Sequence, residues 1–145
     1  MQFNVRVYGL LINNEREVLL TDEQVEGYRF TKFPGGGVEF GEGMTQALKR
    51  EFIEECNTEV EVLSHFYTTD FYVKSAFNDS QIIAVYYLVK PVNELNFTLK
   101  TTAFDFDGDG PALQCFRWKK LNELKPEDVT FPIDQYVVKL LNEQK

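Results

Sequence analysis

Three glutamates gather on one short stretch of the sequence, and their spacing indicates metal chemistry. Glu51, Glu54 and Glu55 lie in the second half of an expected helix, Met44 to Cys56. At about 100° per residue, these acids continue the stripe that is apolar in the first turn and a half. Like charges at this spacing destabilise a helix. A hard divalent cation, Mg²⁺ or Mn²⁺, is the partner that carboxylate oxygens favour.

A solvent-facing acidic helix is the plainer alternative. The letters REFIEE, residues 50–55, would alone favour it, and Arg50 lies four residues before Glu54, where it can offset one acid. A solvated face, however, would place its acids opposite the apolar stripe. Their position on that stripe favours the metal site.

The segment before this helix is rich in glycine. Pro34 is followed by Gly35, Gly36 and Gly37, which allow backbone shapes that other residues resist. Gly43 can serve as the helix N-cap, with Gln46 at the position of a capping partner. The sequence therefore predicts a tight turn that leads into the acidic helix.

The charge balance limits the choice of partner. The 145 residues carry 15 Lys and Arg against 23 Asp and Glu, so the net charge is −8. A net negative charge disfavours binding of a polyphosphate chain through protein cations alone, so we expect no nucleic-acid partner. Phosphates would instead need a bound divalent metal as the source of positive charge.

Cysteine use and hydropathy indicate a cytoplasmic protein without a membrane partner. Cys56 and Cys115 have no CxxC spacing, which argues against zinc and against a disulfide framework. The N-terminus has no targeting pattern, and the longest apolar run, residues 82–89, is too short to span a bilayer.

The remaining pattern predicts one α/β domain over residues 1–145. Residues 3–12 and 17–20 are expected to form a β-hairpin. Further strands are expected over the segments 28–33, 60–73, 81–89 and 113–118, with a closing amphipathic helix after Pro132. The segment 81–89 is apolar on both faces, which is typical of a strand buried on both sides.

The glycine turn and acidic helix together resemble the Nudix box, G-x5-E-x7-R-E-U-x-E-E-x-G-U, where U is a bulky apolar residue. The box would run from Gly36 to Thr58, and the residues at its matching positions are Gly36, Glu42, Arg50, Glu51, Phe52, Glu54 and Glu55. Asn57 stands where the family has glycine, and Asn is the best non-glycine residue for a left-handed helix end. The resemblance implies a Nudix-like α/β/α sandwich with a mixed β-sheet between helices.

The resemblance also implies a reaction. Nudix proteins are mostly Mg²⁺- or Mn²⁺-dependent pyrophosphohydrolases, which use water to cleave a nucleoside diphosphate linked to another group X. The substrate would be a small nucleotide, such as a nucleoside triphosphate, a nucleotide sugar or ADP-ribose. Two alternatives stay open: a nucleotide-binding sensor without hydrolysis, and a hydrolase of a non-nucleotide diphosphate. Many relatives pair, so a homodimer is a further expectation.

The resemblance assigns roles residue by residue. Glu51 and Glu55 would be the principal metal ligands, and Glu54 a further ligand or the general base. Arg50 would orient these acids, and the Gly36 carbonyl would complete the metal site.

Four other residues take smaller roles under the resemblance. Glu42, Gly35 and Gly37 would support the loop or the substrate. Asp107 is the candidate for an extra acid, and it lies in DFDGDG, residues 105–110. That stretch imitates the start of an EF-hand loop but has Phe116 where the loop needs a glutamate, so a plain acidic turn is the better interpretation.

Overall fold

The computed structural model describes residues 2–144, which form two compact units. The first unit combines the N-terminal segment up to Leu11 with Pro34–Asn96, and the second combines Ile12–Phe33 with the segment from Phe97 onward. Each unit is built on its own four-stranded sheet with both parallel and antiparallel pairs. The predicted α/β class with mixed strand pairing is confirmed, and the strands are divided between two sheets.

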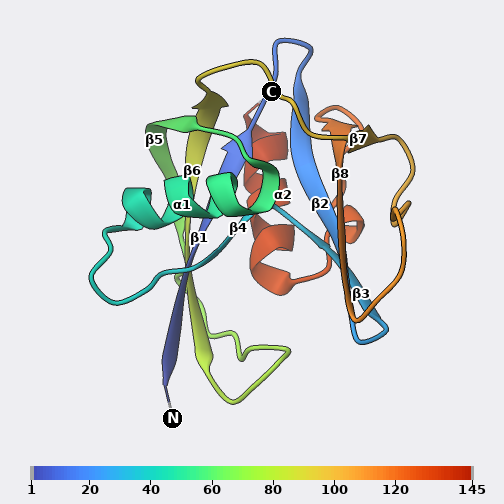
Figure 1. Cartoon of the computed structure of the whole chain (residues 1–145). Coiled ribbons are helices and arrows are strands. Elements are labelled where there is room, and N and C mark those ends of the chain that lie inside the picture. Colours follow the sequence, from blue (N-terminus) through green and yellow to red (C-terminus); the bar gives the residue numbers. More distant parts are fainter. Residues whose placement is uncertain (1, 145) are drawn as a thin grey trace. The chain divides into compact units, whose positions relative to one another are not determined.

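The sheet of the first unit has the strand order β4-β1-β6-β5 (Figure 1). Its members are β1 (Phe3–Leu11), β4 (Gly35–Gly37), β5 (Val60–Thr68) and β6 (Gln81–Pro91). Strand β1 pairs parallel with β6 and antiparallel with the glycine strand β4. The glycine turn of the sequence is therefore an edge strand.

Strand β6 is central in this sheet, as its apolar pattern predicts. The consecutive residues Ala84, Val85 and Tyr86 are all buried, and neighbours in a strand point to opposite faces. The ring of Tyr86 packs against that of Tyr8, with 5.2 Å between centroids. Both faces of β6 are thus covered.

Helix α1 (Met44–Cys56) has the predicted bounds and lies across a face of this sheet (Figure 1). The Gly43 N–H donates to the Gln46 side-chain oxygen at 2.9 Å, and Asn57 ends the helix in the left-handed conformation with φ 49°. A Cβ on Gly9 of β1 would lie 2.6 Å from the Phe52 ring. Glycine at this position lets the helix pack closely on the sheet.

The second unit has the strand order β3-β2-β8-β7. It contains β2 (Glu17–Val25), β3 (Tyr28–Lys32), β7 (Leu99–Lys100), β8 (Ala112–Lys120), the 3₁₀ turn η1 (Pro126–Asp128) and helix α2 (Pro132–Glu143). Helix α2 begins with Pro132 at its first position and buries Ile133 and Val137, as the amphipathic pattern predicts. It also buries Asp134 and Val138, whereas Tyr136 of the predicted stripe is exposed. Among residues 2–144, no helix is long and apolar enough to cross a membrane.

The predicted hairpin between residues 3–12 and 17–20 is wrong. Strands β1 and β2 belong to different sheets, and an isolated bridge between Ile12 and Val18 is the pairing beside their turn. The turn itself forms, because the Asn13 N–H donates to the Glu17 carbonyl at 2.9 Å. Hydrophobic pattern identifies a strand, but its partner depends on distant segments.

The predicted strand over residues 60–73 is longer than the observed strand β5. Strand β5 ends at Thr68, where the Thr69 N–H and hydroxyl both bond the Ala84 carbonyl. These bonds to Ala84 of β6 involve the Thr69 side chain as well as its backbone, so the regular strand pairing ends here.

Candidate active site

Helix α1 places its glutamates at two depths. The side chain of Glu51 is 15% exposed, whereas that of Glu54 is 55% exposed. Glu55 is intermediate, and its neighbours Phe52 and Cys56 are buried. Glu51 and Glu55 thus lie at the edge of the core, as the stripe predicts. For Glu54 the prediction is wrong: this side chain reaches into solvent, because the buried face of α1 continues through Phe52 and Cys56.

Arg50 connects these acids to the glycine-rich loop. Its Nε and Nη2 donate to the two Glu42 oxygens at 2.6 and 2.9 Å. Its Nη1 donates to Glu51 Oε2 at 3.1 Å and to both oxygens of Glu54 at 3.1 and 3.2 Å. Nη2 also donates to the Gly37 carbonyl at 2.9 Å. A planar guanidinium with five donors suits such a role, which a lysine would not fill.

The protonation of the Arg50–Glu42 pair follows from this geometry. The hydrogen bond from Arg50 holds the pKa of the Glu42 carboxyl below its usual value, and the backbone N–H of Glu39 lowers it further. The same bond with Glu42 raises the pKa of Arg50, so the guanidinium stays charged. One fixed cation therefore offsets part of the negative charge of the helix.

Gly36 brings the loop backbone against Glu51. A Cβ at position 36 would lie 2.5 to 2.6 Å from all three atoms of the Glu51 carboxylate. Only glycine leaves that space open, so the Glu51 oxygens lie directly beside the backbone of strand β4.

Glu55 meets the same strand one residue earlier. The Gly35 N–H donates to Glu55 Oε1 at 3.3 Å. Gly35 has φ +146°, and a Cβ there would lie 2.1 Å from the Val7 carbonyl oxygen. A residue with a side chain would therefore push β4 off β1 and away from Glu55.

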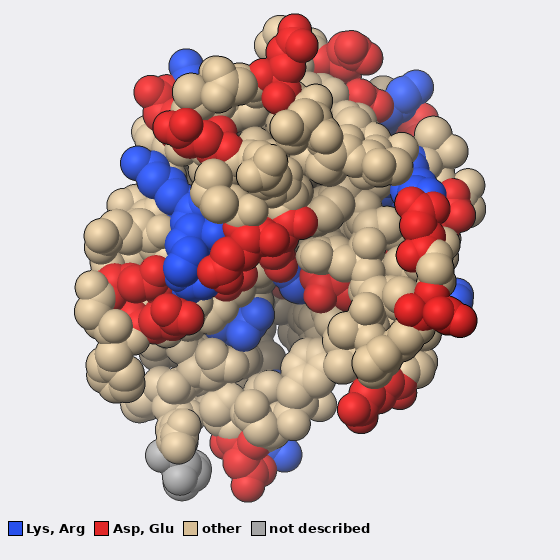
Figure 2. All heavy atoms as spheres, viewed as in Figure 1, with Lys and Arg blue, Asp and Glu red and all other residues tan. Residues whose placement is uncertain are grey.

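Glu42 also shapes the loop between β4 and α1. Its carboxylate accepts the Glu39 N–H at 3.0 Å, and its own N–H donates to the Glu39 carbonyl at 3.1 Å. The loop is thereby closed on itself and tied to Arg50. On the surface over α1, acidic and basic side chains lie side by side (Figure 2).

The donor set at α1 and β4 fits a hard divalent cation. Carboxylate oxygens of Glu51 and Glu55 lie at the backbone of Gly35 and Gly36, and oxygen ligands are those that Mg²⁺ and Mn²⁺ prefer. Within residues 2–144, no three His, Cys, Asp or Glu side chains form a ready-made metal cluster. Mg²⁺ commonly keeps several waters and uses one or two carboxylates, so two glutamates satisfy its needs.

Asp107 lies in the second unit, paired with a lysine. Lys100 Nζ is 2.7 Å from Asp107 Oδ1 and 4.0 Å from Asp105 Oδ2. This ammonium supplies the cation for the acidic turn, which agrees with the interpretation of DFDGDG as a plain turn. The pKa of Lys100 is raised, chiefly by its hydrogen bond to Asp107.

Cys56 and His65 have ordinary structural surroundings. Burial raises the pKa of the Cys56 thiol, which keeps it neutral and unreactive. The exposed ring of His65 lies 2.8 Å from the Thr68 hydroxyl. Neither residue joins the acidic network.

One member of the network was missed from the sequence: the Glu39 carboxylate, which lies 3.9 Å from Arg50 Nε. Gly37 was expected to support the loop, and its carbonyl accepts a hydrogen bond from Arg50 Nη2. The sequence signal for Arg50 was its i to i+4 spacing to Glu54, which says nothing of loop atoms. The loop reaches Arg50 only after β4 pairs with β1.

Comparisons with known proteins agree with this architecture. The NUDIX domain family model matches residues 2–140. A NUDIX hydrolase from Nitrosomonas europaea is 19% identical with a TM-score of 0.72, over 99% of this chain and 91% of that one. A MutT NUDIX hydrolase from Burkholderia pseudomallei is 17% identical with a TM-score of 0.71, over 96% and 98%.

A third similar structure belongs to a study of MutT from Aliivibrio salmonicida and Vibrio cholerae. It is 26% identical with a TM-score of 0.62, over 99% of this chain and 100% of that one. No protein of curated function matches the chain. The family match spans nearly the whole sequence and includes the complete acidic network of α1, so this chain belongs to the Nudix family of hydrolases.

Proposed function

We propose that this protein is a pyrophosphohydrolase that cleaves the diphosphate bond of a nucleoside diphosphate linked to another group, with Mg²⁺ or Mn²⁺ as cofactor. One observation carries the proposal. The Glu55 carboxylate accepts the Gly35 N–H, and the Glu51 carboxylate lies directly beside the backbone of Gly36. We include residues 1–145 in one Nudix domain, because the family model covers residues 2–140.

Glu51 and Glu55 would hold the cation, with the Gly36 carbonyl as a third oxygen donor. When bound, the cation supplies charge that neutralises the diphosphate and lowers the pKa of the attacking water. A chain of net charge −8 needs that source of positive charge to hold a diphosphate.

Arg50 acts as a positioning residue. Its Nη1 contacts both Glu51 and Glu54, so it limits their rotamers and orients their lone pairs. Glu42 fixes the guanidinium from the other side through two hydrogen bonds. Preorganisation of this kind removes reorganisation cost from the chemical step.

Glu54 is our candidate for proton transfer among the three acids. It is the most exposed of the three α1 glutamates that the box contributes, and its contact in the structure is Arg50. We assign it the role of general base or of an additional ligand. A base must reach the water that it deprotonates, and an exposed side chain on the helix surface has that reach.

The test is hydrolysis of a nucleotide panel by the full chain with Mg²⁺, with Mn²⁺ and with EDTA. The panel contains nucleoside triphosphates, nucleotide sugars, ADP-ribose and a dinucleoside polyphosphate, with an isoprenoid diphosphate as the non-nucleotide member. We expect metal-dependent release of a nucleoside monophosphate from one nucleotide class.

Two results would contradict this expectation. Metal-dependent binding of a nucleotide without any cleavage would make the protein a sensor. Turnover of the isoprenoid diphosphate alone would keep the hydrolase and replace the substrate class.

A further inference from the structure

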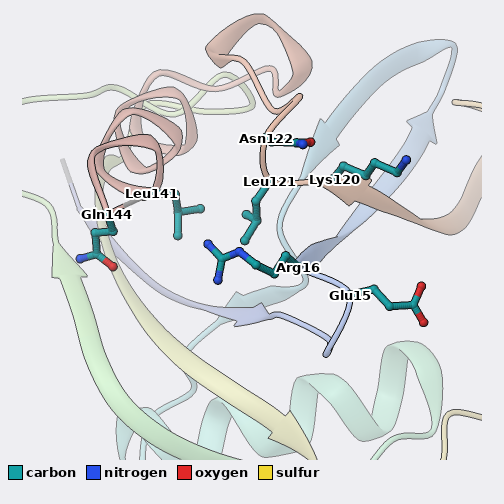
Figure 3. A pocket seen from close by; sticks show the side chains of 7 residues that line it. All are labelled: Glu15, Arg16, Lys120, Leu121, Asn122, Leu141 and Gln144. Carbon is teal, nitrogen blue, oxygen red and sulfur yellow. The ribbon is translucent and has the colours of Figure 1, made fainter.

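A pocket in the second unit contains an arginine that the proposed reaction does not use. Its volume is about 690 Å³, which is within the range of small-molecule sites. The turn before β2, the end of β8 with the turn that follows, and the end of α2 supply its walls (Figure 3). The lining residues are Glu15, Arg16, Lys120, Leu121, Asn122, Leu141 and Gln144.

Arg16 is held in a fixed backbone position. Its φ is 58°, the left-handed region that glycine adopts at lower cost. The Arg16 N–H donates to the Asn13 carbonyl at 3.2 Å, and its carbonyl accepts the Leu121 N–H at 3.0 Å. The direction in which this side chain leaves the turn is therefore set.

The Arg16 guanidinium has no hydrogen bond or ion pair to any other residue in the range 2–144. The same is true of the Lys120 ammonium within that range. Two nearby cations of β8 differ, since Arg117 pairs with Asp22 at 2.7 Å and Lys119 with Asp128 at 3.7 Å. Arg16 is an exposed residue, so its guanidinium is accessible to a ligand from solvent.

The two cations differ in direction. The guanidinium of Arg16 points toward Leu141 and Gln144, whereas the ends of Lys120 and Glu15 point away from it (Figure 3). Arg16 is thus the charged group that the pocket offers to a ligand, and the other two charges lie at its rim.

The surroundings favour a ligand with a single negative charge. The pocket includes the end of α2, and a helix C-terminus carries about half a negative charge. Glu15 and the net charge of −8 add to the repulsion of a polyanion. One planar guanidinium matches one carboxylate, which it binds through two parallel hydrogen bonds.

The walls favour a ligand with an apolar part. Leu121 and Leu141 present aliphatic side chains on the two sides of the guanidinium (Figure 3). The amides of Asn122 and Gln144 supply further donors and acceptors. We propose that this pocket binds a small monocarboxylate whose carboxylate pairs with Arg16 and whose apolar part lies against Leu121 and Leu141.

A purely structural role for Arg16 is the competing explanation. Helix α2 has no basic residue in its last turn, so a nearby arginine would stabilise its negative end. That role predicts a loss of stability on substitution and no change in ligand binding. Ligand binding by variants of Arg16 therefore separates the two explanations.

The experiment is an ¹⁵N NMR titration of the full chain with benzoate and with hexanoate. Benzamide and hexanamide are the uncharged controls, and phenyl phosphate is the doubly charged probe. We expect saturable shifts with the carboxylates at the amides of Arg16, Leu121, Asn122 and Gln144. Arg16→Lys and Arg16→Asn should each weaken binding about tenfold or more, because a bidentate charged contact is lost. Asn tolerates the left-handed conformation, so the second variant keeps the turn.

Lys139→Gln is the matched control, because it removes one exposed positive charge from α2 outside the pocket lining. It should leave the dissociation constant unchanged. The proposal is overturned if neither carboxylate gives saturable shifts, or if both Arg16 variants bind as wild type does. Tighter binding of phenyl phosphate than of both carboxylates would also overturn it. None of these outcomes bears on the proposed hydrolysis.

Discussion

The Arg50 guanidinium holds the Glu42 carboxylate through two hydrogen bonds, from Nε to Oε2 at 2.6 Å and from Nη2 to Oε1 at 2.9 Å. The two residues are eight positions apart, one in the loop and one in α1. The same guanidinium reaches Glu51 and Glu54. The loop and the acidic face of the helix are therefore fixed by a single side chain.

The Arg50–Glu42 bond predicts a pH-dependent contribution to stability. The pKa of Glu42 is lowered in the folded protein, first by Arg50 and then by the Glu39 N–H. Because the pKa is lower in the folded than in the unfolded protein, the stabilisation is fully present at pH values above the pKa of an unfolded glutamate. It is lost as the pH falls through the pKa of the folded protein. Glu42→Gln should therefore be less stable than wild type at neutral pH and approach it at acid pH.

Urea unfolding of both proteins between about pH 7 and pH 3 measures this difference. Glu59→Gln, an exposed acid just beyond α1, is the control for general charge effects. If the stability difference between wild type and Glu42→Gln grew toward acid pH, the Arg50–Glu42 bond would not be the cause of the pH dependence.

Gly36→Ala should damage the site while leaving the fold intact. The new Cβ would lie about where the Glu51 carboxylate now is, and the end of a glutamate side chain can move aside at little cost in stability. Loss of a group that merely orients metal ligands costs about 10- to 100-fold in metal affinity or activity, so displacing Glu51 itself should cost at least as much. Gly43→Ser, at the N-cap, has ordinary space around its Cβ and should keep full activity. Equal activity of the two variants would refute the role of the Gly36 space.

The buried pair of Asp22 and Arg117 should dominate the stability of the second unit. The Asp22 side chain is fully buried and accepts the Arg117 Nε–H at 2.7 Å and the Thr31 hydroxyl at 2.6 Å. Removing one partner of a buried pair costs about 3–5 kcal/mol, because the other charge is left uncompensated. We expect that loss for Asp22→Asn in denaturant unfolding.

The exposed pair of Glu61 and Lys90 is the contrast to this buried pair. Glu61→Gln should cost no more than about 1 kcal/mol. The double variant Asp22→Asn/Arg117→Met should lose less than the sum of its single changes, since neither charge remains. Strict additivity would show that the two side chains do not stabilise each other.

Replacing Asn57 by glycine should destabilise the protein less than replacing it by alanine. It ends α1 with φ 49° and ψ 41°, and its N–H bonds the Ile53 carbonyl. Alanine in this left-handed conformation costs about 1 kcal/mol or more, whereas glycine adopts it freely. Thermal unfolding should rank Asn57→Gly at or above wild type and Asn57→Ala below it. The reverse order would mean that the Asn57 side chain acts through some other contact.

Local signals explain which parts of this structure were predictable. Helix α1 was predicted with its observed bounds, because Gly43 with Gln46 marks its start and Asn57 its end within the same short stretch. Strand β6 was likewise identified by its own apolar pattern. Neither inference needs knowledge of distant segments.

Long-range contacts explain the failures. Strand β1 pairs with β6, about eighty residues away, instead of forming a hairpin with β2. The Gly37 carbonyl meets Arg50 only because β4 folds onto β1. The Arg16 pocket needs three segments from different parts of the chain. The periodicity and spacing of residues in the sequence contain no information about contacts between distant segments.

The most direct test of the central claim compares wild type, Glu55→Gln and Glu59→Gln on the nucleotide panel with Mg²⁺ and with Mn²⁺. Glu55 lies against the Gly35 N–H, whereas Glu59 lies outside the acidic network. We predict metal-dependent turnover by wild type and Glu59→Gln, and a loss of about 100-fold or more in kcat for Glu55→Gln. Turnover by Glu55→Gln at the wild-type rate would contradict the account.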